Sequence, residues 1–213
     1  MIQIVLFCLQ VFFLVCFLWI GFHDKENQGY SLKNHFPGEL SNAKKGKWNV
    51  YIRFLQTLYV LTAIAFGILL FPMDHFSLYS IWLALWIITQ FSLLGLCYVD
   101  TKKIGLHYLL DGVYFTGSMA SFLLPCIDIF HRNPYEYSPY FTIILFLFFV
   151  IELFFLLHPR LRTWYQLVEK EDPKTKQYQW VRQNICFLPL LEWIVLFSLL
   201  AVEFVFYLMV FVF

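Results

Sequence analysis

Charged residues are scarce in this sequence. Asp, Glu, Lys and Arg make up 14% of its 213 residues, whereas a typical soluble domain has roughly 25%. Hydrophobic residues reach 61%, and the mean hydropathy is +0.68. This balance excludes a soluble globular protein and indicates a chain shaped by lipid hydrocarbon. The formal net charge of +1 gives no indication of a nucleic-acid partner.

Several motifs of common enzymes are also missing. The sequence has no phosphate-binding G-x-x-x-x-G-K-[ST], no dinucleotide-binding G-x-G-x-x-G and no zinc-binding H-E-x-x-H. Nucleotide hydrolysis and zinc-dependent proteolysis therefore lose their usual support. The five cysteines are odd in number, contain no C-x-x-C pair and fall within or beside apolar segments. This pattern is typical of packing residues rather than of a redox site.

Six apolar segments are long enough to cross a hydrocarbon core of about 30 Å as α-helices. They cover residues 2–22, 51–71, 76–98, 105–126, 139–158 and 184–213. The sequence therefore predicts an all-α integral membrane protein, a single polytopic domain over residues 1–213 that forms a bundle of six transmembrane helices. The first segment lacks a basic region before it and a small-x-small cleavage site after it, so we expect it to be retained rather than cleaved.

Basic residues are distributed unequally between the two sides of this predicted topology. When the spans alternate, fourteen of the fifteen Lys and Arg residues lie on one side, and Arg132 alone lies on the other. Because basic connections remain in the cytoplasm, we expect connections one, three and five to be cytoplasmic and both termini to be non-cytoplasmic. In the fifth connection, residues 160–170 show an amphipathic helical pattern, which predicts a short interfacial helix ending at Asp172 and Pro173.

Four acidic residues lie inside the predicted spans, namely Asp111, Glu152, Glu192 and Glu203. An acid at membrane depth is costly, by about 2.5–3.5 kcal/mol on insertion scales for Asp. No Lys or Arg lies deep in any span. The carboxyls must therefore be protonated, bind a cation, face water or meet a basic residue of another chain. Counting from the predicted helix ends puts the first three acids at one level in the inner half of the membrane, with Glu203 nearer the outer half.

The fourth span carries a polar stripe. Its members follow a four, three, four, three spacing and are His107, Asp111, Tyr114, Ser118 and Ser121. Such spacing places them on one helix face, which we expect to point into the bundle. Glu192 and Glu203 are eleven residues apart and so share a face of the last span. The candidate substrate- or ion-binding residues are therefore His107, Asp111, Tyr114, Glu152, Glu192 and Glu203.

Three functions from different classes fit these residues. The favoured hypothesis is a small transport or proton- and cation-handling protein that uses Asp111, Glu152 and Glu192 in a cavity. The second is a non-catalytic assembly or regulatory subunit, whose acids meet basic residues of another membrane subunit or of a second copy. The third is a membrane-embedded, metal-dependent enzyme that acts on a lipid through His107, Asp111, Glu152 and His158. These residues show no compact metal-ligand spacing, so the sequence assigns neither a cofactor nor a metal site. The lipid bilayer is the one partner that composition predicts directly.

Overall fold

The computed structural model describes residues 2–23, 32, 35–42, 47–70, 78–99, 103–132, 138–163, 167–171, 178–182 and 185–211. Within them lie six long helices: α1 (Ile2–His23), α3 (Lys47–Leu69), α4 (Tyr79–Tyr98), α5 (Ile104–Arg132), α6 (Ser138–Leu157) and α7 (Phe187–Phe211). All six are long and apolar enough to cross a membrane. The prediction of six spanning helices is thus confirmed, although α5 continues six residues beyond its expected end at 126.

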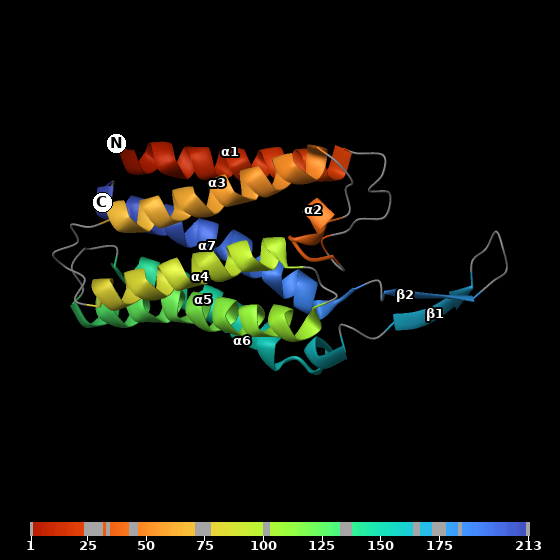
Figure 1. The fold of residues 1–213 in the computed structure, drawn as a ribbon. Coiled ribbons are helices and arrows are strands. Elements are labelled where there is room, and N and C mark those ends of the chain that lie inside the picture. The colour runs from red at the N-terminus through yellow and green to blue at the C-terminus, as the bar shows by residue number, and fades with distance from the viewer. Residues whose placement is uncertain are drawn as a thin grey trace.

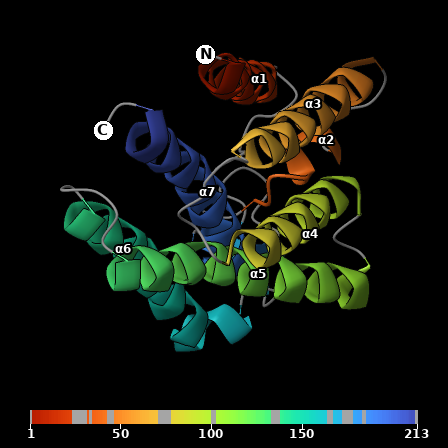
Figure 2. The ribbon, with the colours of Figure 1, turned by 90° about the vertical axis from the view of Figure 1, so that its left-hand side faces the viewer.

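The helices form an up-and-down bundle. In Figure 1, α1 begins and α7 ends at the same end of the bundle, whereas α3, α5 and α7 begin at the opposite end. We call this opposite end, where Ile104 and Phe187 begin their helices, the hairpin end. Helix α7 contacts α1, α5 and α6, so it runs through the interior (Figure 2). It is also the most buried of the spanning helices, while α1 and α6 expose large apolar side chains such as Phe12 and Phe154.

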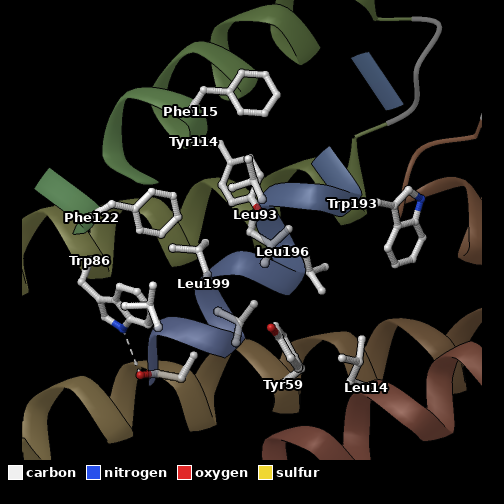
Figure 3. Close-up of a cluster of buried hydrophobic side chains, with 14 of the residues drawn as sticks. Leu14, Tyr59, Trp86, Leu93, Tyr114, Phe115, Phe122, Trp193, Leu196 and Leu199 are labelled. Carbon is white, nitrogen blue, oxygen red and sulfur yellow. Dashed lines mark hydrogen bonds between the residues drawn. The ribbon is translucent and has the colours of Figure 1, made fainter. Parts of the chain in front are cut away.

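Tryptophan side chains of α4 tie it to both neighbouring helices. Pro125 lies inside α5 and, having no N–H, cannot bond to the carbonyl of Ser121 one turn earlier. The indole of Trp82 donates a hydrogen bond of 3.2 Å to that carbonyl instead. On the other side, the indole of Trp86 donates 3.0 Å to the carbonyl of Ala63 in α3 (Figure 3). A proline in a spanning helix is accommodated here because a neighbour satisfies the carbonyl that it leaves.

Helices α4 and α5 approach closely at Gly117. A Cβ atom placed on this glycine would collide with the side-chain hydroxyl of Thr89 in α4. By contrast, a Cβ on Gly112 of the same helix would meet nothing within 4 Å. Gly117 therefore sets the separation of two helices whose contact positions the polar face of α5.

The fifth connection differs from its prediction. Its first residues, Pro159–Thr163, form a 3₁₀ turn, and strand β1 (Leu167–Glu171) then pairs antiparallel with β2 (Tyr178–Arg182). Leu167 pairs with Arg182, and Glu171 with Tyr178, so the two strands form a hairpin beyond the helices (Figure 1). The expected interfacial α-helix is therefore wrong for the described residues.

The hairpin forms because the chain contains a second segment that can pair with residues 167–171, and the helical pattern did not take that segment into account. The second strand reads Tyr-Gln-Trp-Val-Arg, and aromatic and β-branched residues favour strands. Asp172 and Pro173, predicted to end the helix, lie outside the described residues. A helical pattern over eleven residues contains no information about a strand located further along the chain, so it could not reveal this pairing.

Candidate functional site

Three ionisable side chains meet near the hairpin end of the bundle. His107 and Asp111 come from α5, and Glu192 comes from α7. The imidazole Nε2 of His107 lies 3.1 Å from Oε1 of Glu192 and 3.8 Å from Oδ2 of Asp111. One nitrogen or oxygen from each of the three residues lies within 4.8 Å of the others. We call these three residues the acid–histidine cluster.

Local helix geometry explains half of this arrangement. His107 and Asp111 are four residues apart, so they lie one above the other on α5. All five members of the predicted stripe are buried, which confirms that this face of α5 points inward. Glu192 joins them because α7 also begins at the hairpin end and contacts α5. The contact with Glu192 spans 85 positions of sequence, so only tertiary packing creates it.

The cluster is isolated from solvent and from basic side chains. The exposed fractions are 1% for His107, 2% for Asp111 and 0% for Glu192. Both carboxyl oxygens of Asp111, and Oε2 of Glu192, accept no hydrogen bond from a donor group of the described residues, and the two carboxyls lie within hydrogen-bonding reach of each other. In that same part of the chain, no Lys or Arg forms an ion pair with either acid. Two buried carboxylates without compensation would cost several kcal/mol each, so this cluster requires protons or a bound cation.

A short segment of the first connection covers the cluster. We call residues 35–42, which include the one-turn helix α2 (Glu39–Asn42), the cover segment. The ring of Phe36 is fully buried and meets the imidazole of His107 edge-on, with ring centroids 4.5 Å apart. The carboxylate of Glu39 accepts a hydrogen bond of 3.0 Å from the backbone N–H of Phe36. At Gly38 the segment lies so close to the Leu96 carbonyl of α4 that a Cβ would not fit.

Two spanning helices hold the cover segment through its backbone carbonyls. The side-chain amide of Gln56 in α3 donates 3.2 Å to the carbonyl of Pro37. The indole of Trp193 in α7 donates 2.9 Å to the carbonyl of His35. Trp193 directly follows Glu192 of the cluster, so one turn of α7 supplies both a cluster side chain and an anchor for the cover. Sequence reasoning missed this segment, because its apolar residues lie in an otherwise polar connection.

Tyr114 lies one turn beyond Asp111 on the same face of α5. It is fully buried, and its hydroxyl has no hydrogen-bond partner within the described ranges. Its phenol lies in the neighbourhood of both Glu192 and Glu152. In Figure 3 its ring projects from α5 toward α7 beside Leu196. Tyr114 therefore lies on α5 between the acid–histidine cluster and Ser118, the partner of Glu152 in α6.

Glu152 does not join the cluster. Its Oε1 accepts a hydrogen bond of 2.6 Å from the hydroxyl of Ser118. Ser118 lies seven residues from Asp111, or about 10 Å along α5. Helices α5 and α6 are consecutive and antiparallel. Ser118 lies fourteen residues before Arg132, where α5 ends, and Glu152 lies fourteen residues after Ser138, where α6 begins. From the sequence, the depths of Asp111 and Glu152 were counted from the other ends of these helices. That count overlooked the pairing, because α5 is longer than α6.

Glu203 forms a third buried site. Its Oε1 accepts a hydrogen bond of 2.9 Å from the side-chain amide of Gln10 in α1. The phenol of Tyr59 in α3 interacts electrostatically with the same carboxyl. Glu203 lies eleven residues beyond Glu192, or about 16 Å further along α7. Gln10 is fully buried, and its position as a polar residue in the middle of a very apolar span was the signal that could have identified it.

His158 lies apart from these sites. Its ring stacks on Phe187 with centroids 4.3 Å apart, and its Nδ1 accepts a hydrogen bond of 3.2 Å from the backbone N–H of Arg160. It therefore belongs to the junction between α6 and the 3₁₀ turn. The set His107, Asp111, Glu152 and His158, expected for a metal-dependent enzyme, is not assembled in the structure.

The fold and its buried groups define a class but not a family. The chain is a multi-pass membrane protein with six spanning helices and several ionisable side chains in its interior. No protein-family model, curated protein or solved structure matches it. The chain's own residues and their geometry are therefore the basis for inferring its activity.

Proposed function

We propose that this protein handles cations within the membrane, as a small transporter or proton-coupled carrier, and that the acid–histidine cluster is its binding site. One observation carries the proposal: two buried carboxyls lie beside one imidazole, and no Lys or Arg of the described residues pairs with them. Such acids are tolerated in a low-dielectric interior when protons or a bound cation balance their charge. Uptake and release of that cation is the chemistry these groups perform best.

The remaining buried groups extend this site along the bundle. Tyr114 follows the cluster on α5, and the hydrogen-bonded pair of Ser118 and Glu152 follows Tyr114. Hydroxyl and carboxyl groups can both donate and accept protons, so this succession suits a path for protons. The cover segment closes the hairpin end over His107 through Phe36. A displacement of this segment would open the cluster on that side while the helices stay packed.

Burial of the acids favours this proposal over an assembly subunit. That alternative required the acids to face outward and meet basic residues of another chain. Asp111, Glu152, Glu192 and Glu203 are instead at most 2% exposed within this chain. A role in a larger complex or a homo-oligomer therefore loses the support of these acids. The exposed apolar faces of α1 and α6 suit contact with lipid.

We further propose that the hairpin end faces the cytoplasm. Connections one, three and five join the helices at this end (Figure 1), and they hold nearly all of the basic residues. The excess of Lys and Arg in cytoplasmic connections supports this orientation. Under it, both termini are non-cytoplasmic, and the acid–histidine cluster opens toward the cytoplasm when the cover segment moves.

Flux measurements in liposomes test the function. Purified protein is reconstituted into liposomes with an entrapped pH-sensitive dye, and a potassium diffusion potential, negative inside, is imposed with valinomycin. A second set of liposomes contains a zinc-sensitive dye and receives external Zn²⁺. We expect proton or metal uptake above that of protein-free liposomes, and we expect Glu192→Gln to abolish it because the variant removes a cluster carboxylate while retaining its shape.

A matched control separates the cluster from general loss of charge. Glu169→Gln makes the same substitution in strand β1, outside the bundle, and should leave the flux unchanged. Wild-type liposomes that take up neither ion faster than protein-free liposomes would contradict the proposed function. So would a flux that Glu192→Gln leaves intact.

A further inference from the structure

We propose that the acid–histidine cluster is a binding site for a divalent transition-metal ion, with Zn²⁺ as its representative. His107 would supply Nε2, and Asp111 and Glu192 would each supply a carboxylate oxygen. This inference rests on the proposed function, because it names the class of cation that the site takes. It differs from the metal-enzyme hypothesis, which relied on Glu152 and His158 and left Glu192 out.

The ligand atoms already lie near metal-binding separations. Zinc binds imidazole nitrogen and carboxylate oxygen at about 2.0–2.2 Å, so two ligands of a tetrahedral site lie roughly 3.3 Å apart. The distance between His107 Nε2 and Glu192 Oε1 is 3.1 Å, and that between His107 Nε2 and Asp111 Oδ2 is 3.8 Å. All three ligand atoms lie within 4.8 Å of one another, so side-chain rotations that shorten the wider separations would bring them to coordinating distances.

The contact between the two carboxyls gives a second argument for a cation in the cluster. Asp111 Oδ1 and Oδ2 and Glu192 Oε2 accept no hydrogen bond from a donor group of the described residues, and the two almost completely buried carboxyls lie within hydrogen-bonding reach of each other, a contact that requires a proton or a cation between them. Buried polar atoms in native proteins are nearly always satisfied. A metal ion between the three side chains would bind Asp111 directly and leave a second oxygen of each carboxylate available for further coordination.

The charge of the cluster matches a divalent ion. With a neutral imidazole, Asp111 and Glu192 carry two negative charges, which one divalent cation neutralises. The apolar ring of Phe36 on one side of His107 excludes water from that face, so an unbalanced charge would be especially costly there. A monovalent ion would leave one negative charge buried.

The donor set also selects the kind of metal. Mg²⁺ and Ca²⁺ prefer oxygen ligands alone, whereas imidazole with carboxylates suits zinc and divalent iron or manganese. Among the described residues, no cysteine sulfur takes part in the cluster, so it offers no thiolate ligand that would favour Cu⁺. Zn²⁺ and its spectroscopic substitute Co²⁺ are therefore suitable probes.

Equilibrium binding tests the site on the full-length protein in mild detergent. Chelator-treated protein is titrated with Zn²⁺ by calorimetry, and the metal retained after gel filtration is quantified. We expect one Zn²⁺ per chain in the wild type. Glu192→Gln and Asp111→Asn should each weaken binding by at least about tenfold, because even the loss of an outer-shell partner commonly costs 10- to 100-fold.

Glu203→Gln is the matched control. It makes the same change on the same helix, at an equally buried carboxyl, and should bind Zn²⁺ like the wild type. Co²⁺ added to wild-type protein should give the visible absorption of nitrogen- and oxygen-ligated Co²⁺ and lose it when Zn²⁺ is added. This measurement does not depend on whether any variant folds.

The outcomes distinguish this inference from the proposed function. Stoichiometric binding weakened by Glu192→Gln but not by Glu203→Gln supports the metal site, even when liposomes show no flux. No binding by the wild type, or equal binding by all variants, overturns the metal site. Proton flux that persists in that case would leave the proposed function standing with the proton as its cation.

Discussion

The cover segment provides the sharpest test of how the cluster is closed. Phe36→Ala removes a fully buried ring that contacts His107. Truncation of a buried Phe to Ala typically costs about 3–5 kcal/mol. The two hydrogen bonds that hold the segment to the helices, from Gln56 and from Trp193, contribute roughly 1 kcal/mol each. The lost packing is therefore larger than these two hydrogen bonds together, and we expect the segment, then held mainly by the buried side chain of Leu40, to detach locally more often.

Local detachment should make His107 accessible. A loss of about 3 kcal/mol raises the population of the open segment roughly 100-fold. Diethylpyrocarbonate modifies accessible imidazoles, and peptide mass spectrometry follows the modification of His107 separately from that of the other histidines. We expect the modification rate at His107 to rise by about 100-fold in Phe36→Ala. When the segment opens and recloses faster than the reagent reacts, the modification rate is proportional to the population of the open segment.

A second buried phenylalanine is the control. Phe122 of α5 is also fully buried, but it packs against Phe148 of α6, with ring centroids 5.9 Å apart. Phe122→Ala should lower thermal stability by a comparable amount without changing the modification rate at His107 by more than a few-fold. If both variants modify His107 at the same rate, the cover segment does not control access, and the reasoning is refuted.

Three further predictions concern topology, helix packing and the cluster. Single cysteines placed at Lys45 and at Arg132 should react with an impermeant maleimide from opposite sides of the membrane, and labelling from one side would contradict the six-span topology. Gly117→Ala should lower thermal stability by about 1–3 kcal/mol through overpacking, whereas Gly112→Ala in the same helix has room for its methyl group; equal effects would show that the α4–α5 approach is unimportant. Asp111→Asn should abolish cation flux in liposomes while yield and monodispersity stay near normal, and unchanged flux would make this residue structural.

Hydrophobic composition was sufficient to predict the membrane-spanning architecture. In lipid, each backbone polar group must be satisfied within its own helix, so an apolar run of about twenty residues has one stable solution. The fifth connection is the exception. Residues 160–171 lie outside the long apolar runs, where helix and strand compete, and the strand formed because Tyr178–Arg182 could pair with it. That competition is decided by a non-local partner, which local periodicity does not contain.

Periodicity also predicted the inward face of α5, because spacing along one helix determines which side chains share a face. It could not say which helix would lie opposite. The partner of His107 and Asp111 is Glu192, whereas Glu152 pairs with Ser118 and Glu203 with Gln10. Those pairings depend on the relative lengths and crossing of separate helices, which are set by packing across the bundle.

By itself, the sequence determined that this is a six-span membrane protein with costly acids in its interior, because hydropathy and helical spacing are properties of each segment alone. The tertiary structure decided that two of those acids meet a histidine, and that Phe36 closes over them. The cover segment depends on Gln56 and Trp193 in different helices reaching the same short stretch of backbone. These contacts form only when the helices are packed. Each one joins residues that are far apart along the chain and do not interact before packing brings them together.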